Sequence, residues 1–225
     1  VLVTNVDVFP GRNDFIKELK KLNPEITTVI QNINSRDTNV ILGEKQRILF
    51  GKGYINDELC SIKFKISPKS FYQVNPLQTE KLYSLAIEKA NISKNDLVLD
   101  AYCGIGTIGL IASKYAREVV GVEIVKEAVI DAYNNAKNNN IDNAKFYVGD
   151  AGEFILNEYN QGVRYDVVIM DPPRKGSSEE FLSILIKTKP SRIVYVSCNP
   201  ATLARDLKYL SSVYDIVSVN PVDMF

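Results

Sequence analysis

One cysteine, Cys198, stands where a thiol could act as a nucleophile. It lies in Ser197–Pro200, between an apolar run and a helical pattern. Asn199 is a typical N-cap residue, and proline is favoured at the first helical position, which Pro200 would occupy. The dipole at a helix N-terminus stabilises a thiolate. Because the chain contains no histidine, Ser-His and Cys-His catalysis are excluded, and the dipole is the expected activator of Cys198.

The other two cysteines, Cys60 and Cys103, lack this setting and are expected to be structural. Three cysteines without metal-ligand spacing disfavour a disulfide framework and predict no zinc or iron–sulfur site in this chain. Free thiols fit a reducing cytoplasm, which is the expected location. The net charge is zero, so overall charge gives no support to nucleic-acid binding. No apolar run reaches the roughly 18 residues of a membrane span, so no membrane association is expected.

A second candidate for chemistry is Asp171, in the sequence Asp171-Pro-Pro-Arg174. Two consecutive prolines fix the backbone and remove two hydrogen-bond donors. The Asp171 side chain and nearby carbonyl groups are then left to face a ligand. Such a rigid loop, rich in acceptors, suits the edge of a flat nitrogenous base.

A glycine-rich segment follows a short apolar run and predicts a cofactor site. Gly104, Gly106 and Gly109 match the dinucleotide-binding pattern, which by itself is compatible with NAD and with S-adenosylmethionine. Asp100 precedes the glycines, close to where a cationic aminoacyl group could lie.

Two further carboxylates follow the next apolar runs. Glu123 ends the second run, where it could accept hydrogen bonds from both hydroxyls of a ribose. Asp150 follows the third run and could reach the amino group of an adenine. Ligands of open α/β sheets bind beyond the carboxyl ends of the strands, which is where all these residues are expected.

The elements that must position these residues alternate strictly after Ser67-Pro68. Helical patterns separate short apolar runs, and this rhythm predicts a parallel sheet with helices on both faces. The predicted strands are 97–100, 119–123, 145–148, 166–170, 192–196 and, as a sixth, 214–219; the predicted helices are 76–90, 108–115, 126–139, 178–187 and 200–210.

Residues 1–67 have a different pattern. Short alternating runs at 26–30, 47–50 and 62–66, with one helix at 14–22, predict a small antiparallel sheet. The start, Val1–Thr4, reads as a strand and lacks a Met, so the chain is expected to begin inside a longer protein. The sheet of residues 68–225 is expected to be incomplete at its C-terminal end.

In combination, these motifs closely resemble the RNA uracil-5 methyltransferase family. The resemblance rests on Phe71–Asn75, Asp100–Gly106, Gly121–Glu123, Asp171–Arg174 and Ser197–Pro200. It implies a Rossmann-like class I methyltransferase domain at 68–225, preceded at 1–67 by part of an α+β central domain. The family's RNA-binding barrel, often with an iron–sulfur cluster, has no counterpart in these 225 residues.

The resemblance also implies residue roles. Carried over by position, Cys198 is the nucleophile, and Asp171 faces the uracil and borders the cofactor. The S-adenosylmethionine site is implied at Gln73, Asp100, Tyr102, Gly104, Gly106, Thr107, Glu123 and Asp150. Many family members have Phe at the position of Tyr102 and Asn at that of Thr107. The family's general base is a glutamate that follows a stretch like Pro221–Phe225, so it is expected beyond Phe225.

The implied activity is methylation of carbon 5 of a uridine in 23S ribosomal RNA or in transfer RNA, by a monomeric enzyme. Two other functions stay open. A cytosine-5 methyltransferase would use the same thiol chemistry, but Asp171 can accept the N3–H of uracil and would repel the unprotonated N3 of cytosine. A catalytically silent RNA-binding or cofactor-binding module is the other, against which the intact Ser197–Pro200 loop argues.

Overall fold

The computed structural model describes residues 1–37 and 40–225, which form two compact units. The first unit contains residues 1–57 and 65–70, and the second contains 58–64 and 71–225. Their boundary falls within a hairpin formed by β4 (Ile55–Leu59) and β5 (Ile62–Ile66). Cys60 and Ser61 form its two-residue turn with φ of 50° and 59°. This left-handed backbone geometry matches the twist of the two flanking strands.

The first unit is a three-stranded sheet with one helix. It contains β1 (Leu2–Thr4), α1 (Arg12–Leu22), β2 (Thr28–Ile33) and β3 (Lys45–Gly51). Strand β2 pairs antiparallel with β3, as predicted, but parallel with β1. The predicted antiparallel sheet is therefore confirmed for the runs 26–30 and 47–50, but it is wrong for 62–66, which forms β5 and pairs with β4 in a separate two-stranded sheet. The segment with α1 between β1 and β2 is long enough for the crossover that a parallel pair requires.

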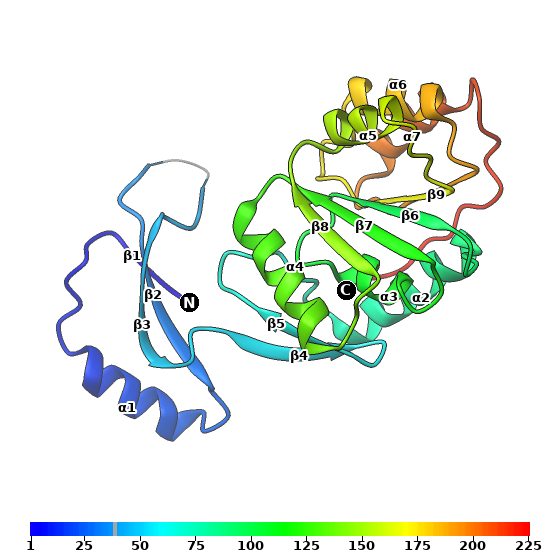
Figure 1. The fold of residues 1–225 in the computed structure, drawn as a ribbon. Helices are drawn as coiled ribbons and strands as arrows, with labels where there is room; N and C mark the ends of the chain where they lie inside the picture. The colour runs from blue at the N-terminus through cyan, green and yellow to red at the C-terminus, as the bar shows by residue number, and fades with distance from the viewer. Residues whose placement is uncertain (38–39) are drawn as a thin grey trace. The chain divides into compact units, whose positions relative to one another are not determined.

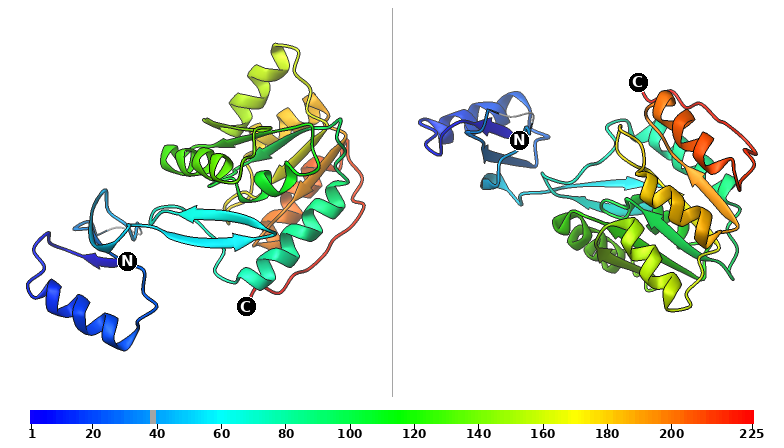
Figure 2. Two further views of the ribbon diagram at one scale, coloured as in Figure 1. Left: turned by 60° about the horizontal axis from the view of Figure 1, so that its bottom comes forward. Right: turned by 90° about the horizontal axis from the view of Figure 1, so that it is seen from above.

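The second unit is built on a five-stranded parallel sheet with the order β8-β7-β6-β9-β10. Helices α2, α3 and α4 lie on one face, and α5, α6 and α7 lie on the other (Figures 1 and 2). The strands are β6 (Leu97–Ala101), β7 (Glu118–Glu123), β8 (Ala144–Val148), β9 (Val167–Met170) and β10 (Arg192–Tyr195). The helices are α2 (Pro76–Ala90), α3 (Thr107–Ala112), α4 (Lys126–Asn138), α5 (Ala151–Asn160), α6 (Glu179–Thr188) and α7 (Pro200–Leu210).

A hydrophobic core of the second unit lies between the sheet and helices α5 to α7. Alternate residues of β6, such as Leu99, contribute to it together with Phe181, Leu182 and Leu185 of α6. The intervening residues of β6 face the other side of the sheet and are also buried, Val98 and Asp100 among them. Because both faces of the central strands are covered, their sequences are continuous apolar runs.

Residues 214–219 do not form the predicted sixth strand. Among the described residues no strand pairs with this segment. Without a hydrogen-bonding partner, an alternating pattern does not stabilise a strand. Val217 is 96% exposed. Tyr214 attaches the segment instead, since its hydroxyl donates to the carbonyl oxygens of Pro190 at 3.0 Å and Leu185 at 3.3 Å.

The core of the second unit makes a first prediction. Leu185 is completely buried, so Leu185→Ala should lower the free energy of unfolding by about 2–5 kcal/mol through lost burial and the remaining cavity. Urea denaturation measures the change. As a control, Leu77→Ala alters a side chain that is 74% exposed and should change stability by no more than about 0.5 kcal/mol. Equal losses in the two variants would contradict this description of the core.

Candidate functional site

The loops that carry the predicted residues meet at the carboxyl ends of the central strands. Ala101, the last residue of β6, is in register with Val122 of β7 and Met170 of β9. Met170 is in register with Tyr195 of β10. Tyr102, Glu123, Asp171 and the turn of Cys198 therefore all lie where strands end at the same edge of the sheet. The parallel register brings together residues that are up to 96 positions apart in sequence.

The loop after β6 needs glycine for two different reasons. At Gly106, φ is 80°, and an added Cβ would lie 2.8 Å from the ring of Phe146, so a side chain is excluded by both conformation and space. At Gly104, φ is 55°, but an added Cβ would meet no atom within 4 Å. The loop is open at Gly104, where a ligand could approach the backbone.

Glu123 lies directly beside this loop. One carboxylate oxygen accepts a hydrogen bond from the Gly104 backbone N–H at 3.1 Å, and the other accepts from the Val125 N–H at 2.9 Å. Each carboxylate oxygen has a second lone-pair direction. Glu123 is thus held in one orientation by the backbone and keeps acceptor capacity for the hydroxyl groups of a ligand.

Two further acidic side chains, Asp100 and Asp171, lie close to Glu123. Asp100 is fully buried and accepts a hydrogen bond from the Gly109 N–H of α3 at 2.8 Å. Burial, followed by the repulsion of Asp171 and Glu123, raises the pKa of Asp100 to about 8. Burial raises the pKa of Asp171 to about 6. A cationic ligand would relieve this repulsion, whereas an anionic pyrophosphate would increase it.

Tyr83 of α2 lies beside two of the predicted cofactor residues, and the sequence did not single it out. It is 3% exposed, and the side chains of Thr107 and Gln73 are its hydrogen-bonding neighbours. Burial, opposed by these hydrogen bonds and reinforced by the charges of Asp171 and Asp100, raises its pKa. Tyr83 thereby connects Gln73 and Thr107, two predicted cofactor residues. Nothing in the sequence distinguishes it from the other buried residues of the α2 stripe.

Asp150 has a clear structural role. It is the N-cap of α5, and one oxygen accepts hydrogen bonds from the N–H groups of Gly152 at 2.8 Å and Glu153 at 3.1 Å. This capping accounts for an acidic residue at the position. Contact with an adenine, for which the second carboxylate oxygen would serve, stays a prediction.

The turn that contains Cys198 is built as the sequence predicts. Asn199 caps α7 by accepting from the Ala201 N–H at 3.0 Å, and Pro200 is the first helical residue. Cys198 is exposed, whereas Cys103 is buried and Cys60 is half-buried. The Nδ2 of Asn199 and the hydroxyl of Thr202 donate to the carbonyl oxygen of Arg174, at 3.4 and 3.3 Å. The accessible thiol thus lies next to the loop of Asp171.

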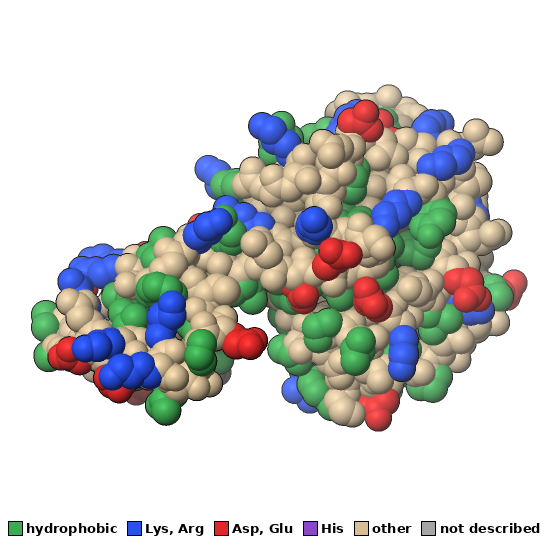
Figure 3. Space-filling model, turned by 90° about the horizontal axis from the view of Figure 1, so that it is seen from below, with side chains coloured by type: hydrophobic (Ala, Val, Ile, Leu, Met, Phe, Trp, Pro, Cys, Tyr) green, Lys and Arg blue, Asp and Glu red, His purple; other side chains and the backbone are tan. Residues whose placement is uncertain are grey.

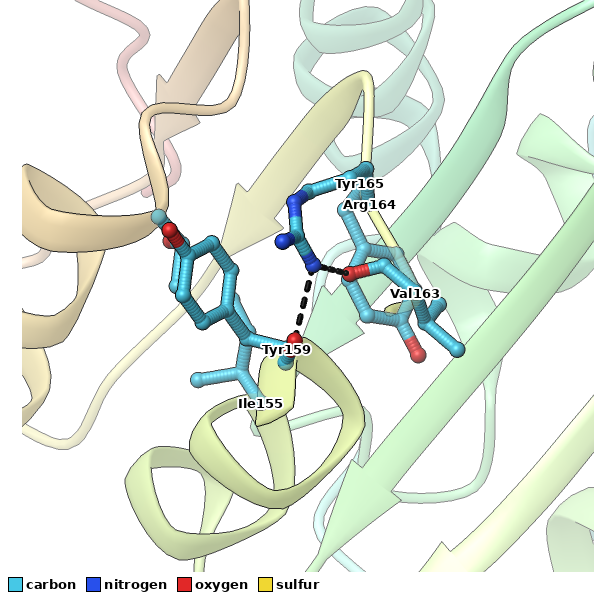
Figure 4. Close-up of a pocket in the computed structure, with 6 residues that line it drawn as sticks. Ile155, Tyr159, Val163, Arg164 and Tyr165 are labelled. Atoms are coloured by element: carbon cyan, nitrogen blue, oxygen red, sulfur yellow. Dashed lines mark hydrogen bonds between the residues drawn. The ribbon is translucent and has the colours of Figure 1, made fainter. Parts of the chain in front are cut away.

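A small cavity elsewhere in the second unit does not belong to this site. It lies between the end of α5 and the start of β9, at the opposite edge of the sheet, and holds about 10 Å³. Arg164 closes it by donating to the carbonyl oxygens of Tyr159 and Val163, both at 2.8 Å (Figure 4). That volume is about one water molecule, too small for a substrate.

The surface charge and the hydrophobicity of the helices exclude few other functions. On the face that Figure 3 shows, both basic and acidic side chains are present. Within residues 1–37 and 40–225, no helix is long and apolar enough to cross a membrane. The same residues contain no cluster of three or more His, Cys, Asp or Glu side chains arranged to hold a metal ion.

The fold of the second unit is the Rossmann-like fold of known S-adenosylmethionine-dependent methyltransferases. A methyltransferase of this class from Agrobacterium tumefaciens shares the fold with a TM-score of 0.61 at 17% identity, over 85% of this chain and 67% of that one. The predicted fold class is confirmed.

The family follows from the sequence comparison. The model of the tRNA (uracil-5-)-methyltransferase family matches residues 15–225, and the chain belongs to this family. It is 49% identical to an RNA methyltransferase of Oceanobacillus iheyensis, over all of this chain and 49% of the relative. It is 48% identical to one of Staphylococcus aureus strain MSSA476, over all of this chain and 50% of the relative. The chain spans about half the length of these curated relatives.

The structure of another uracil-5 methyltransferase is also similar to this chain. The tRNA (uracil-54, C5)-methyltransferase of Pyrococcus abyssi, in complex with S-adenosyl-L-homocysteine, matches with a TM-score of 0.78 and 31% identity. The match covers 99% of this chain and 52% of that one.

The raised pKa values make a second prediction. From about pH 4, the folded protein keeps a proton on Asp171 up to about pH 6 and on Asp100 up to about pH 8, whereas the unfolded chain has lost both. The folded state binds more protons, so the free energy of unfolding should fall as the pH rises through this window. Asp100→Asn should flatten the fall between about pH 6 and pH 8.

Urea denaturation at several pH values in that range measures the slope. Asp142→Asn, which neutralises an exposed carboxylate, serves as the control and should keep the wild-type slope. An unchanged slope in Asp100→Asn would show that Asp100 is already ionised in the folded protein.

Proposed function

We propose that this chain is the catalytic part of an enzyme that methylates carbon 5 of a uridine in ribosomal or transfer RNA. S-adenosylmethionine is the methyl donor, and Cys198 is the nucleophile. Family membership supports the reaction class. The single observation that carries the assignment to these residues is the exposed Cys198 at the N-terminus of α7, a helix whose start is joined by two hydrogen bonds to the loop of Asp171.

The residues fit the cofactor. S-adenosylmethionine carries a sulfonium and an ammonium group, and Asp100 lies close enough to Asp171 and Glu123 for their charges to raise its pKa. The open loop at Gly104 gives access to the backbone, and Glu123 would accept from the ribose hydroxyls. The proposed binding site is completed by Gln73, Tyr102, Gly106, Thr107 and Asp150. When bound, the cofactor supplies an electrophilic methyl group.

Cys198 solves the chemical difficulty of the reaction. Carbon 5 of uracil is a poor nucleophile, but addition of the Cys198 thiolate to carbon 6 turns the ring into an enolate whose carbon 5 can attack a methyl group. A base then removes the proton from carbon 5, and elimination releases the thiolate. Asp171 would accept a hydrogen bond from the N3–H of uracil and so hold the base in a fixed orientation. Cytosine, whose N3 is unprotonated, would be repelled.

Cofactor binding gives the third prediction. Glu123→Ala should weaken binding of S-adenosylmethionine by about 1.5–3 kcal/mol, the value of a hydrogen bond to a charged group. Calorimetry on the full-length protein measures the affinity. The control, Glu127→Ala, alters an exposed carboxylate one turn along the chain and should leave the affinity unchanged. Unchanged affinity in Glu123→Ala, or tighter binding of NAD than of S-adenosylmethionine, would refute the assignment.

The fourth prediction concerns the nucleophile. RNA with 5-fluorouridine at the target position should trap a covalent protein–RNA adduct in the presence of cofactor, because fluorine replaces the proton that the base must remove. Cys198→Ala should abolish the adduct, while Cys60→Ala and Cys103→Ala should retain it. Denaturing electrophoresis detects the adduct. A Cys198→Ala protein that still forms it would exclude Cys198 as the nucleophile.

A further inference from the structure

Asp206 of α7 is a buried carboxylate that the proposed mechanism does not use. It is 1% exposed and accepts hydrogen bonds from three other residues. The hydroxyl of Tyr195 donates to Oδ2 at 2.6 Å, and the backbone N–H of Ser177 donates to the same oxygen at 2.8 Å. The Nε of Arg205 donates to Oδ1 at 2.8 Å.

These donors come from three elements around the proposed site. Tyr195 is the last residue of β10, just before the Cys198 turn. Ser177 ends the loop that begins at Asp171, and Arg205 lies on α7 beside Asp206. The Arg205 guanidinium also donates to the carbonyl oxygens of Lys175 at 3.1 Å and Ser177 at 3.2 Å. Asp206 therefore joins β10, α7 and the Asp171 loop at one point.

The loop is shaped to accept this carboxylate. Gly176 has a φ of 81°, and an added Cβ would lie 2.7 Å from Oδ2 of Asp206 and 2.6 Å from Arg205. A side chain at Gly176 would therefore push the loop away from α7. The Asn199 and Thr202 contacts to the Arg174 carbonyl hold the same loop closer to Cys198.

The connection continues into the cofactor loop. The hydroxyl of Ser177 lies 2.9 Å from that of Tyr102, whose ring packs edge-on against Phe181 at 5.7 Å. Ser177 thus contacts Asp206 through its backbone and Tyr102 through its side chain. Burial and the hydrogen bond to Asp206 raise the pKa of Tyr195, so its hydroxyl stays a donor. Two direct hydrogen bonds, one on each side of Ser177, therefore connect Tyr102 to Asp206.

A buried carboxylate is costly unless its acceptors are filled. The free energy of Asp206 is therefore lowest when Ser177, Tyr195 and Arg205 are all in place, and moving the loop breaks these contacts together. A neutral apolar residue would fill the same space without imposing this geometry.

We propose that Asp206 is a positioning residue for methyl transfer, fixing the loop of Asp171 against the helix that follows Cys198. Through Ser177 it also fixes Tyr102. The inference rests on the proposed function, because it assigns no contact between Asp206 and the substrate. It concerns the relative placement of the group that holds uracil and the group that attacks it.

The test is Asp206→Asn in the full-length protein, assayed by single-turnover trapping on RNA with 5-fluorouridine. Asn keeps the size of Asp but loses the charge and one acceptor. The rate constant for adduct formation should fall by about 10- to 100-fold, the effect of a displacement of about 1 Å between reacting groups. The affinities for RNA and for S-adenosyl-L-homocysteine should stay within a few-fold of wild type.

The amplitude of trapping separates positioning from stability. A purely structural role would reduce the fraction of protein that reacts and leave the rate constant of the remaining fraction at the wild-type value. That result would overturn the proposal. Asp215→Asn, which changes an exposed carboxylate after α7, is the control and should alter neither quantity.

Tyr195→Phe provides a milder variant in case Asp206→Asn does not fold. It removes one donor and keeps the Ser177 and Arg205 contacts, so the rate constant should fall by a smaller factor. An unchanged rate constant in this variant would contradict the proposal. If wild-type protein forms no adduct, the proposed function itself fails. If wild type reacts and Asp206→Asn reacts equally fast, the function stands and only the positioning role is wrong.

Discussion

The parallel register of the central strands is the constraint on which the site depends. Strands β7, β6, β9 and β10 lie side by side and end at one edge of the sheet. The residue after each strand is therefore placed by backbone hydrogen bonds that do not involve the site. Chemistry is added by the loops, and each loop can carry a different function: a glycine-rich turn after β6, carboxylates at the ends of β7 and β9, and a thiol after β10.

The loops are also tied to one another. Glu123 accepts from the loop after β6, and Tyr102 of that loop contacts Ser177 of the loop after β9. Asp206 and Asn199 join that loop to α7. The close approach of three acidic side chains, Asp100, Glu123 and Asp171, is an unfavourable arrangement in isolation. A cationic cofactor would turn it into a favourable one, so the site would be selective in sign as well as in shape.

Much of this arrangement was predictable from sequence, for identifiable reasons. Helix α2 has both a cap and a proline at its start, and the structure bounds it at Pro76–Ala90 as predicted. The central strands β6, β7 and β9 are buried on both faces, which makes them continuous apolar runs. The family was predictable because its motifs are short, ordered and attached to strand ends.

Other features depend on information that the local sequence does not contain. The pattern of 214–219 resembles a strand, but a strand also needs a partner. Strand β1 pairs parallel with β2 because the segment that contains α1 crosses over between them. The pattern within each short run does not predict such a crossover. Helix α5 is not among the predicted helices, and its N-cap is Asp150, for which the sequence predicts a ligand contact. Tyr83 and Asp206 contact their partners only after folding, and neither lies in a recognisable motif.

Tritium release from RNA that carries tritium at carbon 5 of uridine tests the central claim most directly. Methylation at carbon 5 must expel the hydrogen isotope, whereas methylation at nitrogen or at a ribose oxygen leaves it in place. The full-length protein with S-adenosylmethionine should release one tritium to water for each methyl group transferred, and Cys198→Ala should release none. Methyl transfer without tritium release would contradict the proposed reaction, and release by Cys198→Ala at the wild-type rate would contradict its mechanism.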